Sequence, residues 1–106
     1  MSLKFSEKMV TVEEQVLHGS YCELENAVIA FFWVGEKPKM GSLSATLPDK
    51  SSSQLLGDRN EMLSRMMGER IASQFDKIAI VSTNLPRDFD GKSVLELLKE
   101  LLTDGE

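Results

Sequence analysis

The amino-acid sequence predicts an α+β fold of two layers, in which a mainly antiparallel β-sheet carries two helices on one face. Two observations support this prediction. The first half of the chain alternates apolar and polar residues with the period of strands, and two later segments each carry one apolar stripe with the period of a helix. Because each stripe needs an apolar surface to pack on, one sheet that receives both helices on the same face is the most economical architecture.

The N-terminal residues 3–25 are predicted to form strands, because apolar residues recur at alternate positions with polar residues largely between them. The apolar positions that share one parity are Val10, Val12, Val16, Cys22 and Leu24. Breaks or bulges are expected at the pairs Gly19-Ser20 and Glu25-Asn26. The pattern is typical of strands with one buried face.

Residues 27–34 form the longest apolar run, and both parities of this run are apolar. A strand of this kind needs cover on both of its faces. Two helices on one face leave the other face open, so one of two alternate sets is expected to face a partner or a covering segment: Ala27, Ile29, Phe31 and Trp33, or Val28, Ala30, Phe32 and Val34. The alternative is that the strands of residues 3–25 fold over this face and cover it.

The middle of the chain is expected to hold a turn, a strand, a loop and a helix. The Pro38-containing turn 35–41 leads into a strand at residues 43–47, and residues 51–57 are expected to form a loop. Asp58 and Glu61 resemble a capping box that begins a helix, with Asp58 as the N-cap. The apolar stripe of this helix is Leu63, Met66, Met67, Ile71 and Phe75; Met62, Met66 and Met67 are expected to fill the core, and Gly68 to let the helix approach a sheet closely.

The last third of the chain is expected to hold one more strand and one more helix. Residues 77–85 are predicted to form a strand that Pro86 ends. Asp90 is predicted to cap a final helix whose apolar stripe is Val94, Leu97, Leu98 and Leu101.

Length and composition predict a single domain that spans residues 1–106. The chain is 42% hydrophobic and 27% charged, which is ordinary globular usage. Its formal net charge of −5 argues against nucleic-acid binding through phosphate contacts. A membrane-spanning helix needs about 20 apolar residues, far more than the run at 27–34 offers. The single cysteine, Cys22, cannot form an internal disulfide, which suits a reducing compartment.

Catalytic and metal-binding motifs are hard to find in this sequence. His18 and Cys22 are the only histidine and the only cysteine, too few for a Cys/His zinc site, and they are interpreted as ordinary strand or loop residues. No phosphate-binding glycine loop and no nucleophile elbow is present. We therefore expect no catalytic residue, no cofactor and no metal. An enzyme that uses Cys22 as nucleophile with His18 as base remains a less favoured alternative.

Four segments in order resemble the proteasome assembly chaperone 4 family. Residues 31–35, Phe-Phe-Trp-Val-Gly, are similar to that family's Phe-Leu-Trp-Val-Gly strand, and residues 51–58 are similar to its Ser/Thr-rich approach to Leu-Leu-Gly-Asp. A helix of similar spacing at 63–67 follows, then a strand at 78–85 like the family's Val-Phe-Val-Ser-Tyr-Asn-Leu. The resemblance covers residues 25–102. Residues 10–24 match poorly, and the turn 35–41 is this chain's own.

The resemblance implies a non-catalytic chaperone that pairs with a related small chaperone (assembly chaperone 3). The pair would bind an α-type subunit, chiefly α5, and promote assembly of the 20S proteasome α-ring in the cytoplasm, with the nucleus as a second location. Ile29, Phe31 and Trp33 are the candidate residues for pairing, because aromatic anchors are favoured at interface centres. Candidate contacts to the α-subunit lie on exposed segments: Lys37, Lys39, Gln54, Leu55 and Asp58.

Two further expectations accompany this hypothesis. An isolated chain is expected to be able to form homodimers, because an unpaired apolar face can pair with a second copy of itself. The alternative function is a small-molecule-binding regulatory domain on the same scaffold, which would need a closed apolar pocket with convergent polar groups.

Overall fold

The computed structural model describes residues 2–104, so the predicted domain span 1–106 reaches beyond the described residues at both ends. Six strands and two helices follow one another in the order β1 (Phe5–Val12), β2 (Gln15–Glu23), β3 (Ala27–Val34), β4 (Ser42–Thr46), β5 (Ser52–Leu56), α1 (Glu61–Phe75), β6 (Ile78–Asn84) and α2 (Gly91–Asp104).

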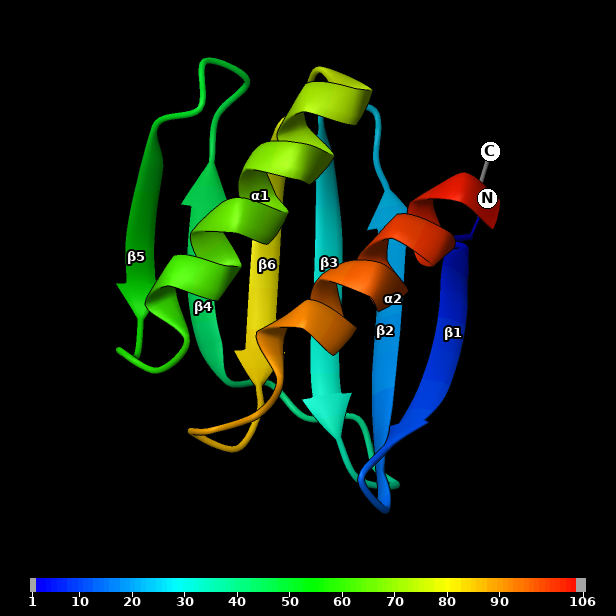
Figure 1. Cartoon of the computed structure of the whole chain (residues 1–106). Helices are drawn as coiled ribbons and strands as arrows, with labels where there is room; N and C mark the ends of the chain where they lie inside the picture. The colour runs from blue at the N-terminus through cyan, green and yellow to red at the C-terminus, as the bar shows by residue number, and fades with distance from the viewer. Residues whose placement is uncertain (1, 105–106) are drawn as a thin grey trace.

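The six strands form one sheet with the order β1-β2-β3-β6-β4-β5. All neighbouring pairs are antiparallel except β3 and β6, which are parallel. Both helices lie on the same face of this sheet, with α1 across β4 and β6 and α2 across β1 and β2 (Figure 1). The predicted α+β fold of two layers is therefore confirmed.

The N-terminal strands form a hairpin whose turn the sequence pattern did not indicate. Val12 pairs with Gln15, so Glu13 and Glu14 form a two-residue turn, and both have positive φ (48° and 69°). Such a turn usually takes Asn-Gly, which adopts this backbone without strain. The predicted break at Gly19-Ser20 is wrong, because β2 runs through both residues in register with β3. The alternative, in which these strands fold over the apolar strand 27–34 as a second layer, does not hold, since they extend the same sheet at its edge.

The core lies between the sheet and the helices. Val28, Ala30 and Phe32 of β3 are fully buried there, together with Leu17 of β2 and Val81 of β6. The predicted strand at 77–85 and the predicted strand at 27–34 are confirmed as the two central, parallel strands of the sheet. In both strands, the residues between these buried positions point away from the helices. The prediction that one alternate set of residues 27–34 faces away from the helices is therefore confirmed, and that set is Ala27, Ile29, Phe31 and Trp33.

The segment predicted as a loop at 51–57 is instead the edge strand β5, so that prediction is wrong. Thr46 pairs with Ser52 in the β4–β5 hairpin, and their hydroxyl oxygens lie 2.9 Å apart in a hydrogen bond. Serines are weak strand formers, and here the pairing with β4 decides the conformation.

Helix α1 begins later than the sequence suggested. Its N-cap is Asn60, in the left-handed region and without a side-chain capping bond, so the capping box of Asp58 and Glu61 is wrong. Met67 is fully buried as predicted, but Met62 and Met66 are 77% and 48% exposed, so their predicted role in the core is wrong. Both lie on the outer side of the helix, although Met66 is the direct neighbour of the buried Met67.

Two local features bring the helices onto the sheet. A Cβ at Gly68 would collide with the side chain of Thr46 in β4, so glycine allows the predicted close approach of α1. Asp90 caps α2 as predicted: its carboxylate accepts hydrogen bonds from the backbone N–H of Lys92 (3.1 Å) and the hydroxyl of Ser93 (2.8 Å).

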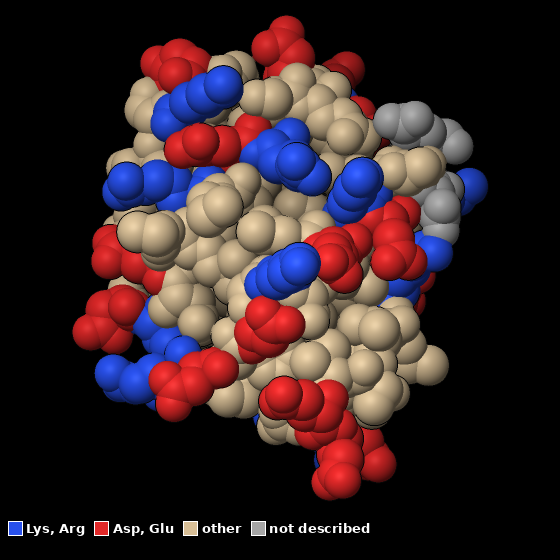
Figure 2. Space-filling view, viewed as in Figure 1, with Lys and Arg blue, Asp and Glu red and all other residues tan. Residues whose placement is uncertain are grey.

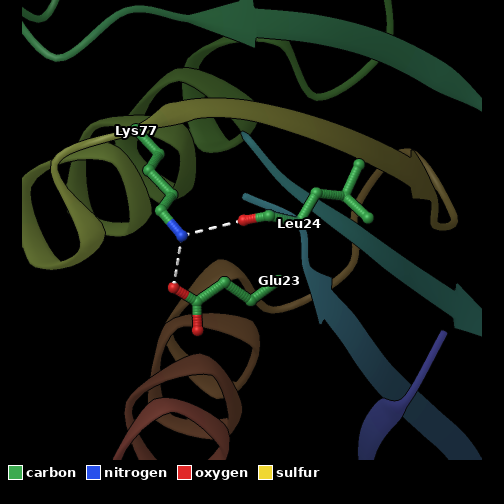
Figure 3. Close-up of polar contacts among 3 residues, drawn as sticks. All are labelled: Glu23, Leu24 and Lys77. Carbon is green, nitrogen blue, oxygen red and sulfur yellow. Dashed lines mark hydrogen bonds and ion pairs between the residues drawn. The ribbon is translucent and has the colours of Figure 1, made fainter. Parts of the chain in front are cut away.

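Lys77, in the link between α1 and β6, ties that link to the β2–β3 turn (Figure 3). Its Nζ lies 2.7 Å from the carboxylate of Glu23 and donates a hydrogen bond of 2.8 Å to the carbonyl oxygen of Leu24. The contact holds together two segments that are 53 residues apart in sequence.

Candidate partner-binding face

One face of the sheet carries no helix, and the strand register shows which side chains lie on it. Directly paired residues in neighbouring strands point to the same face. Since Val28, Ala30 and Phe32 face the helices, their alternate neighbours in β3 face the other way, together with the residues paired to them in β2 and β6. We call this surface the open face. Its apolar members in the strands are Phe5, Met9, Val16, Cys22, Ala27, Ile29, Phe31, Trp33, Leu43, Ala45, Leu56, Ile78 and Ile80.

Charged side chains are nearly absent from the open face. Within the strands that the structure describes, the register places one charged residue there, Glu7 of β1. The helix side of the molecule is different, because lysine, arginine, aspartate and glutamate side chains are spread over it (Figure 2). A broad, mainly apolar surface with few charges is typical of a protein–protein contact.

Two of the three residues predicted for pairing lie near the middle of the open face. Ile29 and Phe31 are half-buried and stand next to each other on β3. The ring of Phe31 lies 6.5 Å from the ring of Phe5 on β1, across the intervening strand β2. Phe5 was not among the residues predicted for pairing, because the residues of its parity in β1 include Glu7 and Thr11 and show no clear apolar alternation.

The third predicted pairing residue, Trp33, is covered within the chain itself. Only 5% of its surface is exposed, and its indole stacks on the imidazole of His18 with 4.9 Å between ring centroids and 3° between planes. Pro38 and Met40 line a groove of about 400 Å³ together with Trp33 and Phe5. In this conformation Trp33 is packed within the open face and offers little surface to a partner.

The segment 35–41 is held against the sheet at its C-terminal end. The side-chain amide of Asn84 donates a hydrogen bond of 3.0 Å to the carbonyl oxygen of Met40, and the N–H of Gly41 donates one of 3.0 Å to the hydroxyl of Ser82. Gly41 is required there, since a Cβ would collide with the backbone of Thr83. Lys37 and Lys39, two of the predicted α-subunit contacts, are exposed on this segment.

The other predicted α-subunit contacts lie on and after β5. Leu55 is 51% exposed, Asp58 is exposed, and Gln54 donates a hydrogen bond of 3.0 Å from its amide to the carbonyl oxygen of Leu56. The structure brings the two candidate segments together at one point, because Asp58 and Gly41 line the same small hollow of about 280 Å³.

The geometry gives no support to a catalytic pair of Cys22 and His18. Four residues along an extended strand span about 13 Å, which separates the thiol from the imidazole that would activate it. The imidazole is stacked on Trp33 and the thiol is buried. Among residues 2–104, no group of three or more His, Cys, Asp and Glu side chains lies close enough to hold a metal ion. None of the helices in that range is long and apolar enough to cross a membrane.

One carboxyl group has a shifted pKa. Hydrogen bonds from the side chain and the backbone N–H of Ser51 lower the pKa of Asp49 below 3.8. Both residues belong to the exposed β4–β5 turn, so the shift reflects turn formation and points to no acid–base chemistry.

The fold and this surface together define a class of protein: a small two-layer α+β protein with one uncovered apolar sheet face. No protein-family model and no curated protein matches the sequence. Among solved structures, the chain is similar to a chain of the crystal structure of a novel chaperone complex for yeast 20S proteasome assembly. The TM-score is 0.64 at 13% sequence identity, and the match covers 97% of this chain and 94% of that chain. The family resemblance seen in the sequence motifs is therefore accompanied by a shared fold.

Proposed function

We propose that this chain is a non-catalytic chaperone that promotes assembly of the 20S proteasome α-ring. The observation that carries the proposal is the open face, an apolar sheet surface on which the described strands place a single charged side chain, Glu7. The fold shared with a chain of a yeast proteasome assembly chaperone complex supports it, as does the order of the four resembling segments. In this role the chain acts in the cytoplasm and the nucleus.

The proposed first partner is a related small chaperone (assembly chaperone 3), bound through the open face. Two sheets pack face to face at about 10 Å when apolar side chains of both interdigitate. Ile29 and Phe31 of β3, Ile80 of β6 and Leu43 of β4 are half-buried and form the centre of such a contact. In the absence of this partner, a second copy of the chain is the expected substitute.

The proposed client is an α-type subunit, α5, bound by the exposed ends of two segments. Lys37 and Lys39 lie on one of these segments, and Leu55 and Asp58 lie on the other. Exposed segments on a rigid sheet commonly carry binding residues. Their meeting at the hollow beside Gly41 supports one continuous contact.

A second candidate function rests on the groove beside Trp33. A regulatory domain that binds a small apolar molecule would use this groove of about 400 Å³. Phe5, Phe31 and Trp33 are among its apolar residues, and its polar groups are Glu7, Ser20 and Lys39. The volume lies in the range of ligand pockets, which is about 300–1,000 Å³. A small molecule that raises the melting temperature of the isolated chain would favour this function over assembly.

The test of the assembly role is capture of the tagged full chain from its native cell, with mass spectrometry of what accompanies it. We expect a second small chaperone and α-type subunits, with little mature 20S particle. The variant Phe31→Glu places a charge on the open face and is expected to lose the second chaperone. Met62→Glu is the matched control, because Met62 is an exposed apolar residue on the helix side.

The outcomes separate the parts of the proposal. Loss of the second chaperone in both variants, or in neither, would contradict pairing through the open face. A folded, soluble wild-type bait that recovers neither a small chaperone nor an α-type subunit would contradict the assembly role itself.

A further inference from the structure

The outer edge of β5 is a second surface that could bind a partner, because its backbone groups on that side are not paired with another strand in the described part of the chain. β5 is the last strand of the sheet and pairs with β4 on one side only; within residues 2–104 no strand pairs with its other side. An open strand edge presents backbone N–H and C=O groups that an extended chain can complete.

The register shows which backbone groups point outward. The N–H of Leu47 donates a hydrogen bond of 2.9 Å to the carbonyl oxygen of Ser51, so these two residues face each other across the β4–β5 hairpin. Bonded and non-bonded pairs alternate in an antiparallel ladder. The N–H and C=O groups of Ser52 and Gln54 therefore point away from β4, toward the open edge.

The two edges of the sheet differ in their protection. β1, at the other edge, carries the charged residues Glu7 and Lys8 and lies under α2. Charges of this kind discourage the addition of another strand. β5 has the sequence Ser-Ser-Gln-Leu-Leu, with no charge and no proline, and it ends on Leu55 and Leu56, which are 51% and 58% exposed.

We propose that the β5 edge binds an extended, uncharged segment of the client α-type subunit as an added strand. Backbone hydrogen bonds to Ser52 and Gln54 would set the register, and the exposed Leu55 and Leu56 would contact apolar side chains of that segment. This inference rests on the proposed function and specifies how the client is held. Oppositely charged residues flank the edge at both ends, Asp49-Lys50 and Asp58-Arg59, which favours a segment without net charge.

The shortness of the edge favours a client segment over a second copy of β5. Two outward residues offer about four backbone hydrogen bonds, since each residue has one N–H and one C=O. A second copy would bring an equally short edge. A client already held at another contact binds the edge at a high effective concentration, so a short strand is sufficient.

The test uses the full chain and a purified recombinant α5 subunit as the probe. Gln54→Pro removes an outward N–H without breaking a bond to β4, and we expect affinity for α5 to fall at least tenfold. Thr11→Pro is the matched control at the opposite edge. Val16 accepts a hydrogen bond from Gly35 of the β3 end, so its partner Thr11 also turns its N–H outward. Thermal melts establish that both variants fold.

Hydrogen–deuterium exchange of the wild-type complex gives a second reading that needs no variant. We expect α5 to slow exchange at the amides of Ser52 and Gln54 and to leave the outward amide of Thr11 unchanged. Binding of α5 by the wild type, with neither slowed exchange at β5 nor a difference between the two proline variants, would overturn the inference and leave the assembly role standing. Protection of β5 in the chain alone, rising with its concentration, would assign the edge to a second copy instead and overturn it too. Failure of the wild type to bind α5 would overturn both proposals.

Discussion

Replacing Trp33 by alanine separates support of the fold from contact with a partner. Burial of a tryptophan side chain removes about 150–250 Å² from water, and tryptophan-to-alanine changes in cores cost about 3–5 kcal/mol. Trp33 is 95% buried, but an open groove lies beside it, so the neighbouring side chains and water can fill part of the space. We therefore expect the lower end, about 3 kcal/mol.

A loss of this size is large but leaves the chain folded. A domain of this length has a stability of about 5–15 kcal/mol, and 3 kcal/mol lowers the melting temperature by roughly 12–24 °C. Circular dichroism is the assay, because the variant lacks the only tryptophan and hence its fluorescence. A melting temperature equal to that of the wild type would refute the reasoning and return Trp33 to the role of a partner anchor.

His18 provides an internal check on the same prediction. Its ring stacks on Trp33, and aromatic pairs of this kind couple by about 0.5–1.5 kcal/mol. His18→Ala should therefore destabilise the wild type more than it destabilises Trp33→Ala. Equal effects in the two backgrounds would show that the stacked geometry contributes nothing to stability.

Three further predictions concern the scaffold. Replacing Glu13-Glu14 by Asn-Gly should stabilise the chain by about 1–2 kcal/mol, because both positions have positive φ, and urea denaturation measures the gain. Gly68→Ala should destabilise by about 1–2 kcal/mol, since overpacking against Thr46 outweighs the better helix propensity, and Thr46→Ala should recover part of the loss in the same denaturation experiment. A carbon-detected NMR titration should place the pKa of Asp49 below 3.8; the stability that its hydrogen bonds contribute is present above that pH and is lost as the pH falls through the lowered pKa, a dependence that Asp49→Asn removes.

The predictions from the sequence were most accurate where a side-chain pattern is compatible with a single kind of secondary structure. The apolar run at 27–34 became the strand β3 with the predicted bounds, because eight apolar residues between turn residues have the length of a central strand and are short for a helix. The stripe of α2 and its cap at Asp90 were also right, since a capping carboxylate acts within a single turn.

The sequence-based predictions were wrong where tertiary contacts determine the local structure. Val10 and Val16 share a parity in sequence, yet the two-residue turn between them puts Val10 on the helix face and Val16 on the open face. Parity carries across a strand but not across a tight turn, and two glutamates give no sign of such a turn. β5 likewise has a sequence of weak strand formers and exists because β4 offers it an edge.

The uncovered face of β3 links these results to function. Residues 5–23 form two further strands that are long enough to cover this face, but they join the sheet beside β3 and widen it instead. Among residues 2–104, the segment 35–41 lies beside Trp33, where Pro38 and Met40 line the same groove, and Ile29 and Phe31 stay half-buried. Widening the sheet increases the apolar surface that a second sheet can bury, whereas folding those strands over it would have removed that surface. The arrangement therefore favours further stabilisation of the chain by a bound partner. It predicts that binding of the partner buries more surface of Ile29 and Phe31 than of Trp33.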